Sequence, residues 1–227
     1  MASAERITLY YSPQSRATGT RILFDELGID YDLHILNMKA GEQRQPAYLA
    51  VNPLGKVPAI RHGAALVTEQ VAIAIYVADL YPEAGLTPAL DDPLRGPYLR
   101  FLAYYGASFE PALIDRFRQI EPAPRSQSPY CDYDSMLGVL EAQLSQGPYL
   151  FGERLTAADI FWGTALAWTT GFGLVPLKPA FKAFIDRMTG RPHFGRVTAE
   201  DAVLAAEHAK AAGQSRMLSD GIARPSI

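Results

Sequence analysis

Apolar and polar positions divide the chain into a first part with strand and helix patterns and a second part with helix patterns only. Residues 7–11 and 31–35 alternate with a period of two, which is typical of half-buried strands. Between them, residues 16–27 have helical spacing, and Gly28 follows where a helix C-cap belongs. Gly19 inside this helix costs about 1 kcal/mol relative to Ala, so we expect something local to favour a small residue there. A β-α-β unit needs a crossover connection, which predicts parallel strands.

The next segment predicts a hairpin followed by a buried helix. A strand over residues 56–61 carries a proline near its start, and a short strand over residues 65–68 closes the hairpin after the His62-Gly63 turn. The helix expected over residues 69–81 is apolar on nearly every side. Such a helix is covered on two faces, here by the sheet and by a second domain.

The rest of the chain shows no strand pattern. Residues 82–93 hold three prolines, one glycine and two aspartates, and they are interpreted as a linker. Gly106 and Pro111 are expected to bend the first of the helices that follow. These helices are predicted over residues 94–117, 132–144, 157–170, 181–188 and 194–210.

The pattern therefore predicts two domains of different classes. We expect an α/β domain over residues 1–83 and an all-α helical domain over residues 93–212. Residues 213–227 are polar without periodicity, and we expect a mobile tail there.

Composition excludes several function classes. The 227 residues are 48% hydrophobic and 20% charged, which is a globular composition. The net charge of −3 argues against a nucleic-acid partner, which would require a basic face. Cys131 is the one cysteine, so an internal disulfide, a Cys-X-X-Cys redox pair and a Cys-rich zinc site are excluded, and we predict no metal.

The sequence also carries expectations about location. Met1 is followed by polar residues instead of a basic-then-apolar leader, so we expect no secretion signal. Apolar runs stay well short of the ~20 residues that a membrane span needs, so we expect no membrane association and a cytoplasmic protein.

The segment Asn52-Pro53-Leu54-Gly55-Lys56-Val57-Pro58 predicts a binding edge. Proline removes a backbone donor and belongs at the edge or start of a strand. If the Val57–Pro58 bond is cis, the amide and carbonyl of Val57 turn outward, and a peptide ligand can pair with both as an added short strand. The alternative is a plain loop-to-strand turn.

A second candidate binding feature is the junction of strand and helix at Leu66-Val67-Thr68-Glu69-Gln70. Helix N-termini offer free N–H groups and a positive dipole end, which bind carboxylates. Glu69 beside them would complement an ammonium group, so the two together would recognise an amino-acid head group. The alternative is that Glu69 only complements the dipole of its own helix.

With these motifs, the chain resembles the cytosolic glutathione transferase family over essentially its whole length. The resemblance lies in Ser12-Pro13-Gln14-Ser15, the NPxGKVP segment, Thr68-Glu69-Gln70 and the helix-start motif of residues 152–159. In the last of these, Thr156 and Asp159 are expected to form a capping box. The resemblance implies a thioredoxin-like N-terminal domain, an all-helical second domain, glutathione as co-substrate, a homodimer and a role in detoxification.

By this resemblance, the cysteinyl part of glutathione binds the backbone of Val57, before Pro58. Glu69 and Gln70 hold its γ-glutamyl group, although the family often has Ser at the position of Gln70. Lys39 or Lys56 reaches its glycine carboxylate. The alternative for either lysine is a solvated surface charge.

The catalytic position differs between classes of the family. Tyr10-Tyr11-Ser12-Pro13-Gln14-Ser15 resembles the insect delta and bacterial beta classes, which predicts that the Ser15 hydroxyl activates the thiol. Arg16 stands where the beta class has Cys, which argues against mixed-disulfide chemistry. Ser12 or Ser15 could instead be only a helix N-cap.

The resemblance also implies an electrophile pocket between the domains, for which Tyr11, Tyr104, Tyr105 and Ser108 are candidates. The alternative for the helical aromatics is a place in the core. We expect conjugation of the glutathione thiolate to a small hydrophobic electrophile. Two alternatives stay open: glutathione-dependent isomerisation, dehalogenation or disulfide reduction at the same site, and a partner-binding protein of this fold without glutathione.

Overall fold

The first domain is built on one mixed sheet. The computed structural model describes residues 5–222, and the side chains of residues 5–213. Within them, strands β1 (Ile7–Tyr11), β2 (Tyr31–Ile35), β3 (Ala59–His62) and β4 (Ala65–Thr68) form a sheet in the order β2-β1-β3-β4. β1 and β2 are parallel, whereas β3 is antiparallel to both β1 and β4. The predicted β-α-β unit and hairpin are therefore confirmed.

The two faces of β1 carry different side chains. Ile7, Leu9 and Tyr11 are buried, while the residues between them are half-buried. On the second face, the Tyr10 ring lies 5.7 Å from that of Tyr48. Alternation along the strand therefore directs Tyr11 away from the side on which Tyr10 lies.

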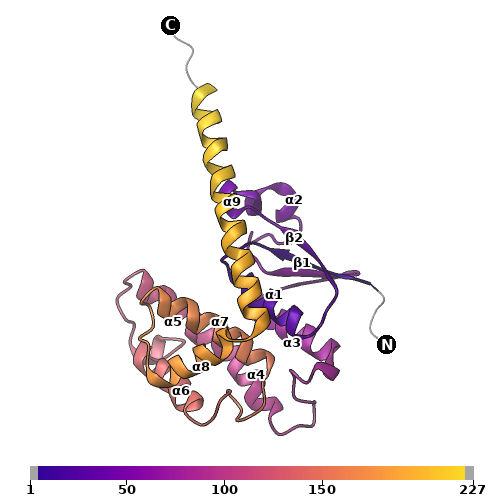
Figure 1. Cartoon of the computed structure of the whole chain (residues 1–227). Coiled ribbons are helices and arrows are strands. Elements are labelled where there is room, and N and C mark those ends of the chain that lie inside the picture. Colours follow the sequence, from indigo (N-terminus) through magenta and orange to yellow (C-terminus); the bar gives the residue numbers. More distant parts are fainter. Residues whose placement is uncertain (1–4, 223–227) are drawn as a thin grey trace.

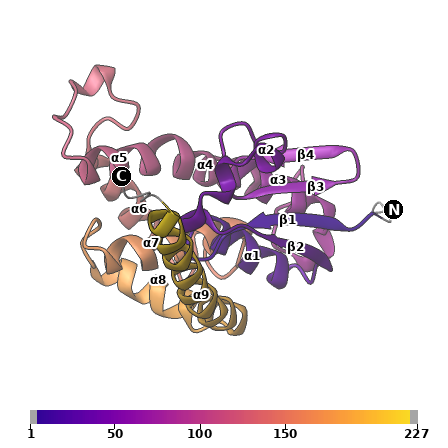
Figure 2. The ribbon, with the colours of Figure 1, turned by 90° about the horizontal axis from the view of Figure 1, so that it is seen from above.

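Helices connect the strands of the first domain, and two of them contact the helical domain. They are α1 (Ala17–Glu26), α2 (Pro46–Leu49) and α3 (Gln70–Leu80), with short 3₁₀ turns η1 (Met38–Ala40), η2 (Glu42–Arg44) and η3 (Pro82–Ala84). α1 packs against α3, and both contact α7 of the helical domain. Figure 1 shows α1 and α3 on one side of the sheet and α2 on the other, and Figure 2 shows the helical domain beside the first domain.

The close packing explains Gly19. A Cβ at this position would lie 3.3 Å from Phe161 Cδ1 and from Gln70 Nε2, which is tighter than ordinary contact. The expectation that the surroundings favour a small residue is therefore confirmed, since a Cβ here would press on side chains of α7 and α3.

The segment expected to be a linker is packed against both domains. Leu86 and Thr87 are buried, and the Leu86 carbonyl accepts a hydrogen bond from Ala157 N–H at 2.8 Å. Arg95 donates to the Asp79 carboxylate and to Thr87 Oγ1. Hydrogen bonding by Arg95 lowers the pKa of Asp79 below its usual value.

The second domain is a helical bundle. Its helices are α4 (Arg95–Tyr104), α5 (Glu110–Phe117), α6 (Tyr133–Leu144), α7 (Ala157–Gly171), α8 (Pro179–Thr189) and α9 (Pro192–Ile222), with a 3₁₀ turn η5 (Arg125–Gln127) in the loop before α6. The long helix predicted over residues 94–117 is interrupted by a π-helical turn, η4 (Tyr105–Phe109). Such turns insert one residue into a helix and are frequent at functional sites.

The start of α7 is capped as predicted. Asp159 Oδ2 accepts from Thr156 N–H at 2.8 Å, and the pair forms a capping box. Asp159 Oδ1 also accepts from Leu150 N–H at 2.7 Å. Burial raises the pKa of Asp159 to about 6.

α9 differs most from expectation. It continues to Ile222, so the tail expected from residue 213 is helical as far as that residue, and only residues 223–227 of the expected tail lie outside the described part. Figure 1 shows α9 leaving the helical domain, running alongside the first domain and extending beyond it. Within residues 5–222, none of the helices combines the length and the hydrophobicity that a membrane span requires.

Candidate functional site

A pocket lies where the loop after β1 meets η1 and α9. It has a volume of about 180 Å³ and is lined by residues 12–15, Met38, Lys39, Ala205 and His208. The loop leads directly into α1, so the positive end of that helix lies next to the pocket. The structure therefore brings both candidate serines and one candidate lysine to one concave site.

The two serine hydroxyls of the loop have different partners. Ser15 Oγ donates to the Ser12 carbonyl oxygen at 2.7 Å and accepts from Ala17 N–H at 3.1 Å. Ser12 is 3% exposed, and its own hydroxyl bonds to no described residue. Ser15 thus serves the first turn of α1, and its hydrogen must turn away from the Ser12 carbonyl to reach a ligand.

Tyr11 does not line a pocket, which corrects its assignment to the electrophile side. It is fully buried, and its hydroxyl donates to the Asp201 carboxylate on α9. Burial and this carboxylate raise the pKa of the phenol well above its ordinary value. Because the Tyr11 hydroxyl already donates to Asp201, it is not a candidate donor for a thiolate.

Val57 has unpaired backbone groups next to a cis proline bond, as the sequence predicts. The Val57–Pro58 bond is cis, and β3 pairs with its neighbours only from Ala59 onward. Within the described residues, neither the amide nor the carbonyl of Val57 has a hydrogen-bond partner. The preceding turn is held firmly, since the Lys56 carbonyl accepts from Tyr48 Oη and Asn52 Nδ2.

Glu69 stands at the N-cap of α3 in an unusual conformation. Its φ of 64° and ψ of 116° lie in a region that costs a non-glycine residue on the order of 1–3 kcal/mol. Its side chain is exposed and has no partner among the described residues. The surrounding structure therefore holds a strained residue whose carboxylate is open to a ligand.

The Gln70 side chain points toward α1. Its Nε2 lies against Gly19 on α1, and its Oε1 is buried without a hydrogen-bond partner among the described atoms. The backbone N–H of Gln70, in the open first turn of α3, is the group of this residue best placed to bind a carboxylate.

The two candidate lysines are placed differently. Lys39 lies in η1 and lines the pocket, where His208 of α9 is a second nitrogen-bearing side chain. Lys56 is exposed and does not line this pocket. Asn37 fixes the neighbourhood, because its side chain donates to the His208 carbonyl at 3.2 Å and accepts from Lys39 N–H.

The candidates on the long helix separate into two environments. Tyr104 donates to the Met136 carbonyl at 2.9 Å inside the helical domain. Tyr105 belongs to the π-helical turn and donates to Glu110 Oε1 at 2.9 Å. Burial raises the pKa of Tyr105. Ser108 is half-buried in the same turn.

Glu110 links the turn to the first domain. Its carboxylate accepts from Arg16 Nε at 2.7 Å and pairs with Arg16 Nη2 at 2.6 Å. The Arg16 guanidinium also lies 5.9 Å from the centre of the Trp168 ring. Arg16, next to Ser15, thus joins the loop to α5 and α7.

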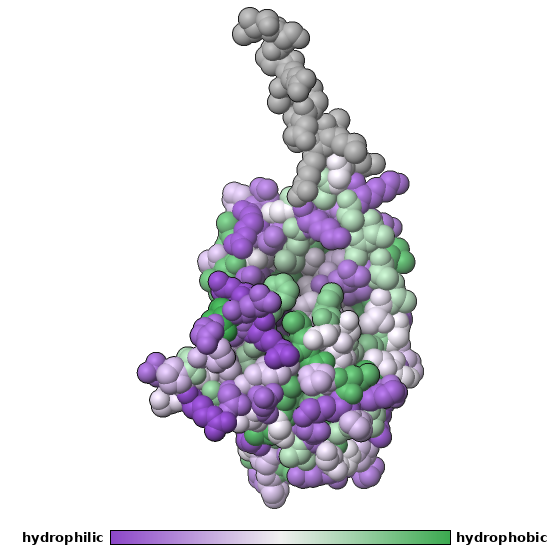
Figure 3. Space-filling view, turned by 90° about the vertical axis from the view of Figure 1, so that its left-hand side faces the viewer, coloured by the Kyte–Doolittle hydropathy of each residue, from purple (hydrophilic) through white to green (hydrophobic). Residues whose placement is uncertain are grey.

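Sequence reasoning missed Glu110, Trp168, Asp201 and His208. Each reaches the loop or pocket from the helical domain, and only the folded chain shows which helical side chains do so. Hydrophobic side chains gather near the middle of the face shown in Figure 3. Trp168 is 46% exposed, and its ring packs edge-on against that of Phe172, which is an unusual exposure for large aromatic residues.

Three further features of the described residues bear on other kinds of site, and none contains a candidate residue from the sequence. A larger cavity of about 680 Å³ lies between the start of α4 and the end of α6. Cys131 is an exposed free thiol in the loop before α6. Among the described residues, no group of three His, Cys, Asp or Glu is arranged to hold a metal ion.

Comparison with protein families gives one answer for both domains. Residues 5–79 match the glutathione S-transferase N-terminal domain, and residues 132–198 match the glutathione S-transferase C-terminal domain.

Curated relatives cover most of the chain. Glutathione S-transferase F10 of Arabidopsis thaliana is 30% identical over 169 residues, which is 68% of this chain and 76% of that protein. Glutathione S-transferase GstA of Escherichia coli O157:H7 is 28% identical over 187 residues, 81% of this chain and 93% of that protein. The disulfide-bond oxidoreductase YfcG of Escherichia coli K12 is 28% identical over 204 residues, 84% of this chain and 93% of that protein.

A solved structure agrees with these relatives. The glutathione transferase homologue from Sulfitobacter, solved with bound glutathione, superposes with a TM-score of 0.71 at 27% identity. The match covers 88% of this chain and 99% of that one.

Proposed function

This chain belongs to the glutathione S-transferase family, and from that premise we propose that it conjugates glutathione to a small hydrophobic electrophile held between its two domains. The observation that carries the proposal is the pocket at the start of α1, which gathers the Ser12 and Ser15 hydroxyls with Lys39. A hydroxyl donor beside a helix N-terminus is what a thiolate requires.

Glutathione would bind in three parts. Its cysteinyl backbone pairs with the open amide and carbonyl of Val57, as an added strand. Its γ-glutamyl ammonium group meets the Glu69 carboxylate, and its α-carboxylate meets the amides at the start of α3. The exposed Glu69 side chain and its strained backbone support this role, since strain of this kind gathers at ligand clamps. Lys39 then reaches the glycine carboxylate.

The loop after β1, residues 12–15, would activate the thiol of glutathione. A free thiol has a pKa near 8.5 and is mostly protonated at neutral pH. We assign the donor to Ser15, whose hydroxyl leaves the Ser12 carbonyl for the thiolate because a hydrogen bond to an ionised acceptor is roughly twice as strong as a neutral one. Ser12 is the rival, since its hydroxyl has no partner among the described residues.

The electrophile would lie next to the contact between Arg16 and Glu110. This ion pair is 41% and 22% exposed, and the partly exposed Trp168 ring beside it provides an apolar wall. Tyr105 binds the same carboxylate. A soft, apolar electrophile fits this mixture of an aromatic face and a neutralised ion pair.

The family resemblance also supports a homodimer in the cytoplasm. Sedimentation velocity tests the dimer, and fractionation of the source cells tests the location.

Two measurements test the proposed activity. We expect retention on immobilised glutathione, elution by free glutathione, and saturable conjugation to a chlorodinitrobenzene. Reduction of a small disulfide without conjugation would favour the reductase alternative, which is the activity in the name of YfcG. Failure both to bind and to conjugate would leave the partner-binding alternative.

A further inference from the structure

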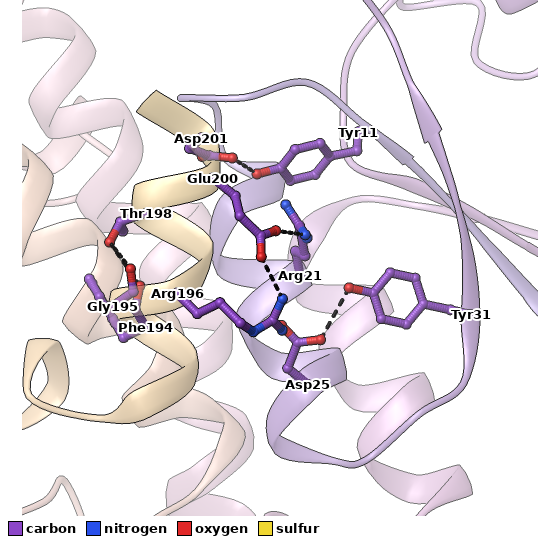
Figure 4. Close-up of polar contacts among 10 residues, drawn as sticks. All are labelled: Tyr11, Arg21, Asp25, Tyr31, Phe194, Gly195, Arg196, Thr198, Glu200 and Asp201. Carbon is purple, nitrogen blue, oxygen red and sulfur yellow. Dashed lines mark hydrogen bonds and ion pairs between the residues drawn. The ribbon is translucent and has the colours of Figure 1, made fainter. Parts of the chain in front are cut away.

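Asp201 connects α9 to the loop that contains both candidate serines. It is 3% exposed, and both of its carboxylate oxygens are used. Oδ1 accepts from the Tyr11 hydroxyl, and Oδ2 accepts from Gln14 N–H at 3.0 Å and from Thr18 Oγ1 at 2.6 Å. Figure 4 shows Asp201 on α9 pointing across to Tyr11. One buried carboxylate thus binds the end of β1, the loop and the first turn of α1.

The loop needs such support because its backbone is strained. Gln14 has a φ of 52°, which lies in the left-handed region and is uncommon for a residue other than glycine. Its N–H is the atom that Asp201 binds, and Ser15 is the next residue. Holding the Gln14 amide therefore fixes the direction in which Ser15 leaves the loop.

Ion pairs also join α1 to α9 and to the residue before it. Arg191 pairs with Glu26 at 2.6 Å, and Glu200 pairs with Arg21. Figure 4 shows the second of these pairs beside Asp201. These contacts hold α9 along α1 without touching the loop. Asp201 is the residue of α9 that binds the loop directly. Ala205 and His208, one and two turns further along α9, line the pocket.

We propose that Asp201 is a positioning residue for thiol activation: it holds the Gln14 amide and the Thr18 hydroxyl so that the loop presents its serine hydroxyl to the glutathione sulfur. This inference rests on the proposed function. A carboxylate near a thiolate is unfavourable by charge alone, so a contribution of Asp201 to activation must come from geometry. Geometry and charge therefore predict opposite effects when the residue is removed.

The test compares Asp201→Ala with Asp201→Asn. An asparagine can accept from Gln14 and Thr18 through its oxygen and donate to the Tyr11 oxygen through its nitrogen, so it keeps the geometry without the charge. The measured quantities are the dissociation constant of glutathione, the pKa of its bound thiol from thiolate absorbance, and kcat/KM for conjugation across pH.

For Asp201→Ala we expect the bound thiol pKa to rise by about one unit, which corresponds to a tenfold loss of thiolate at neutral pH. Loss of alignment should lower kcat/KM by roughly tenfold or more. Asp201→Asn should recover most of both losses. Arg196→Ala is the matched control, because Arg196 joins α9 to Asp25 but does not contact the loop. It should leave the thiol pKa unchanged.

If Asp201→Ala does not fold, Thr18→Val tests the proposal instead, since it removes one donor to Asp201 Oδ2 while keeping the side-chain shape. It should raise the thiol pKa in the same direction by a smaller amount. The inference is overturned if the thiol pKa stays the same or falls in Asp201→Ala, or in Thr18→Val where the first variant is unfolded. It is equally overturned if asparagine is as impaired as alanine. A wild-type protein that does not bind glutathione overturns the proposed function instead.

Discussion

The half of the site proposed for glutathione and the half formed with the helical domain are built in different ways. The first uses backbone groups at the ends of secondary structure: the Val57 amide and carbonyl before β3 and the open amides of α3. The second uses single side chains that cross between domains, as in the contacts from Glu110 to Arg16 and from Asp201 to Tyr11. Backbone recognition depends on local sequence, whereas the crossing contacts join residues far apart in the chain.

This difference has a consequence for substitution. A backbone donor survives most side-chain changes, so we expect the part of the site proposed for glutathione to tolerate sequence variation. A contact between two side chains of different domains is lost when either residue is substituted. We therefore expect variants in the first half to act on glutathione affinity, and variants in the second half to act on turnover and on the electrophile.

The largest effect is expected for Glu69→Ala, which removes the carboxylate proposed for the first half. Loss of a charge-assisted hydrogen bond worth about 1.5–3 kcal/mol should raise the glutathione dissociation constant by roughly 10- to 100-fold. Isothermal titration calorimetry measures this change. An analogue without the γ-glutamyl amine is the control, since its affinity should hardly depend on Glu69. Equal losses for both ligands would mean that Glu69 acts through folding.

Ser15→Ala should bind glutathione nearly as well and conjugate about tenfold more slowly at neutral pH, because the bound thiol pKa rises by roughly one unit. The deficit should shrink as pH rises through the new pKa, since the thiol then ionises in both proteins. Ser12→Ala and Tyr11→Phe are the matched controls in pH–rate profiles. If Ser12→Ala shows this pH-dependent loss and Ser15→Ala does not, Ser12 is the donor. If none of the three shows it, the chain relies on backbone donors.

Lys39→Ala should raise the glutathione dissociation constant by about three- to tenfold, and less so at high salt, because an exposed charge is screened. Lys56→Ala should have no effect, since Lys56 does not line the pocket. Glutathione esterified at glycine should be insensitive to both. A larger loss for Lys56→Ala would reverse the assignment.

Arg16→Ala should leave glutathione affinity unchanged and alter KM for the electrophile by about threefold. Its ion pair with Glu110 is partly exposed, so stability should fall by less than about 1 kcal/mol. Steady-state kinetics and thermal unfolding measure the two effects. A loss of glutathione affinity would place Arg16 in the first half of the site.

Much of the fold was predictable because it depends on neighbours in sequence. The β-α-β unit, the hairpin and the Thr156–Asp159 capping box all follow from local patterns. The π-helical turn at Tyr105–Phe109 does not, since one inserted residue hardly changes the apolar spacing of a long helix.

The end of α9 was missed for a different reason. The sequence from Gly213 onward is polar without periodicity, but a helix that is already nucleated can continue through such residues. The place of Tyr11 was missed because strand alternation shows which face a side chain takes, and not what covers that face. Only the fold shows that the cover is Asp201.

The central claim is that this chain binds glutathione as its thiolate. The most direct test is titration of the ultraviolet absorbance of the thiolate in the wild-type complex. We predict a bound thiol pKa at least about one unit below the value near 8.5 of a free thiol. A bound thiol that titrates at the free value, with glutathione saturating the site, would contradict the account.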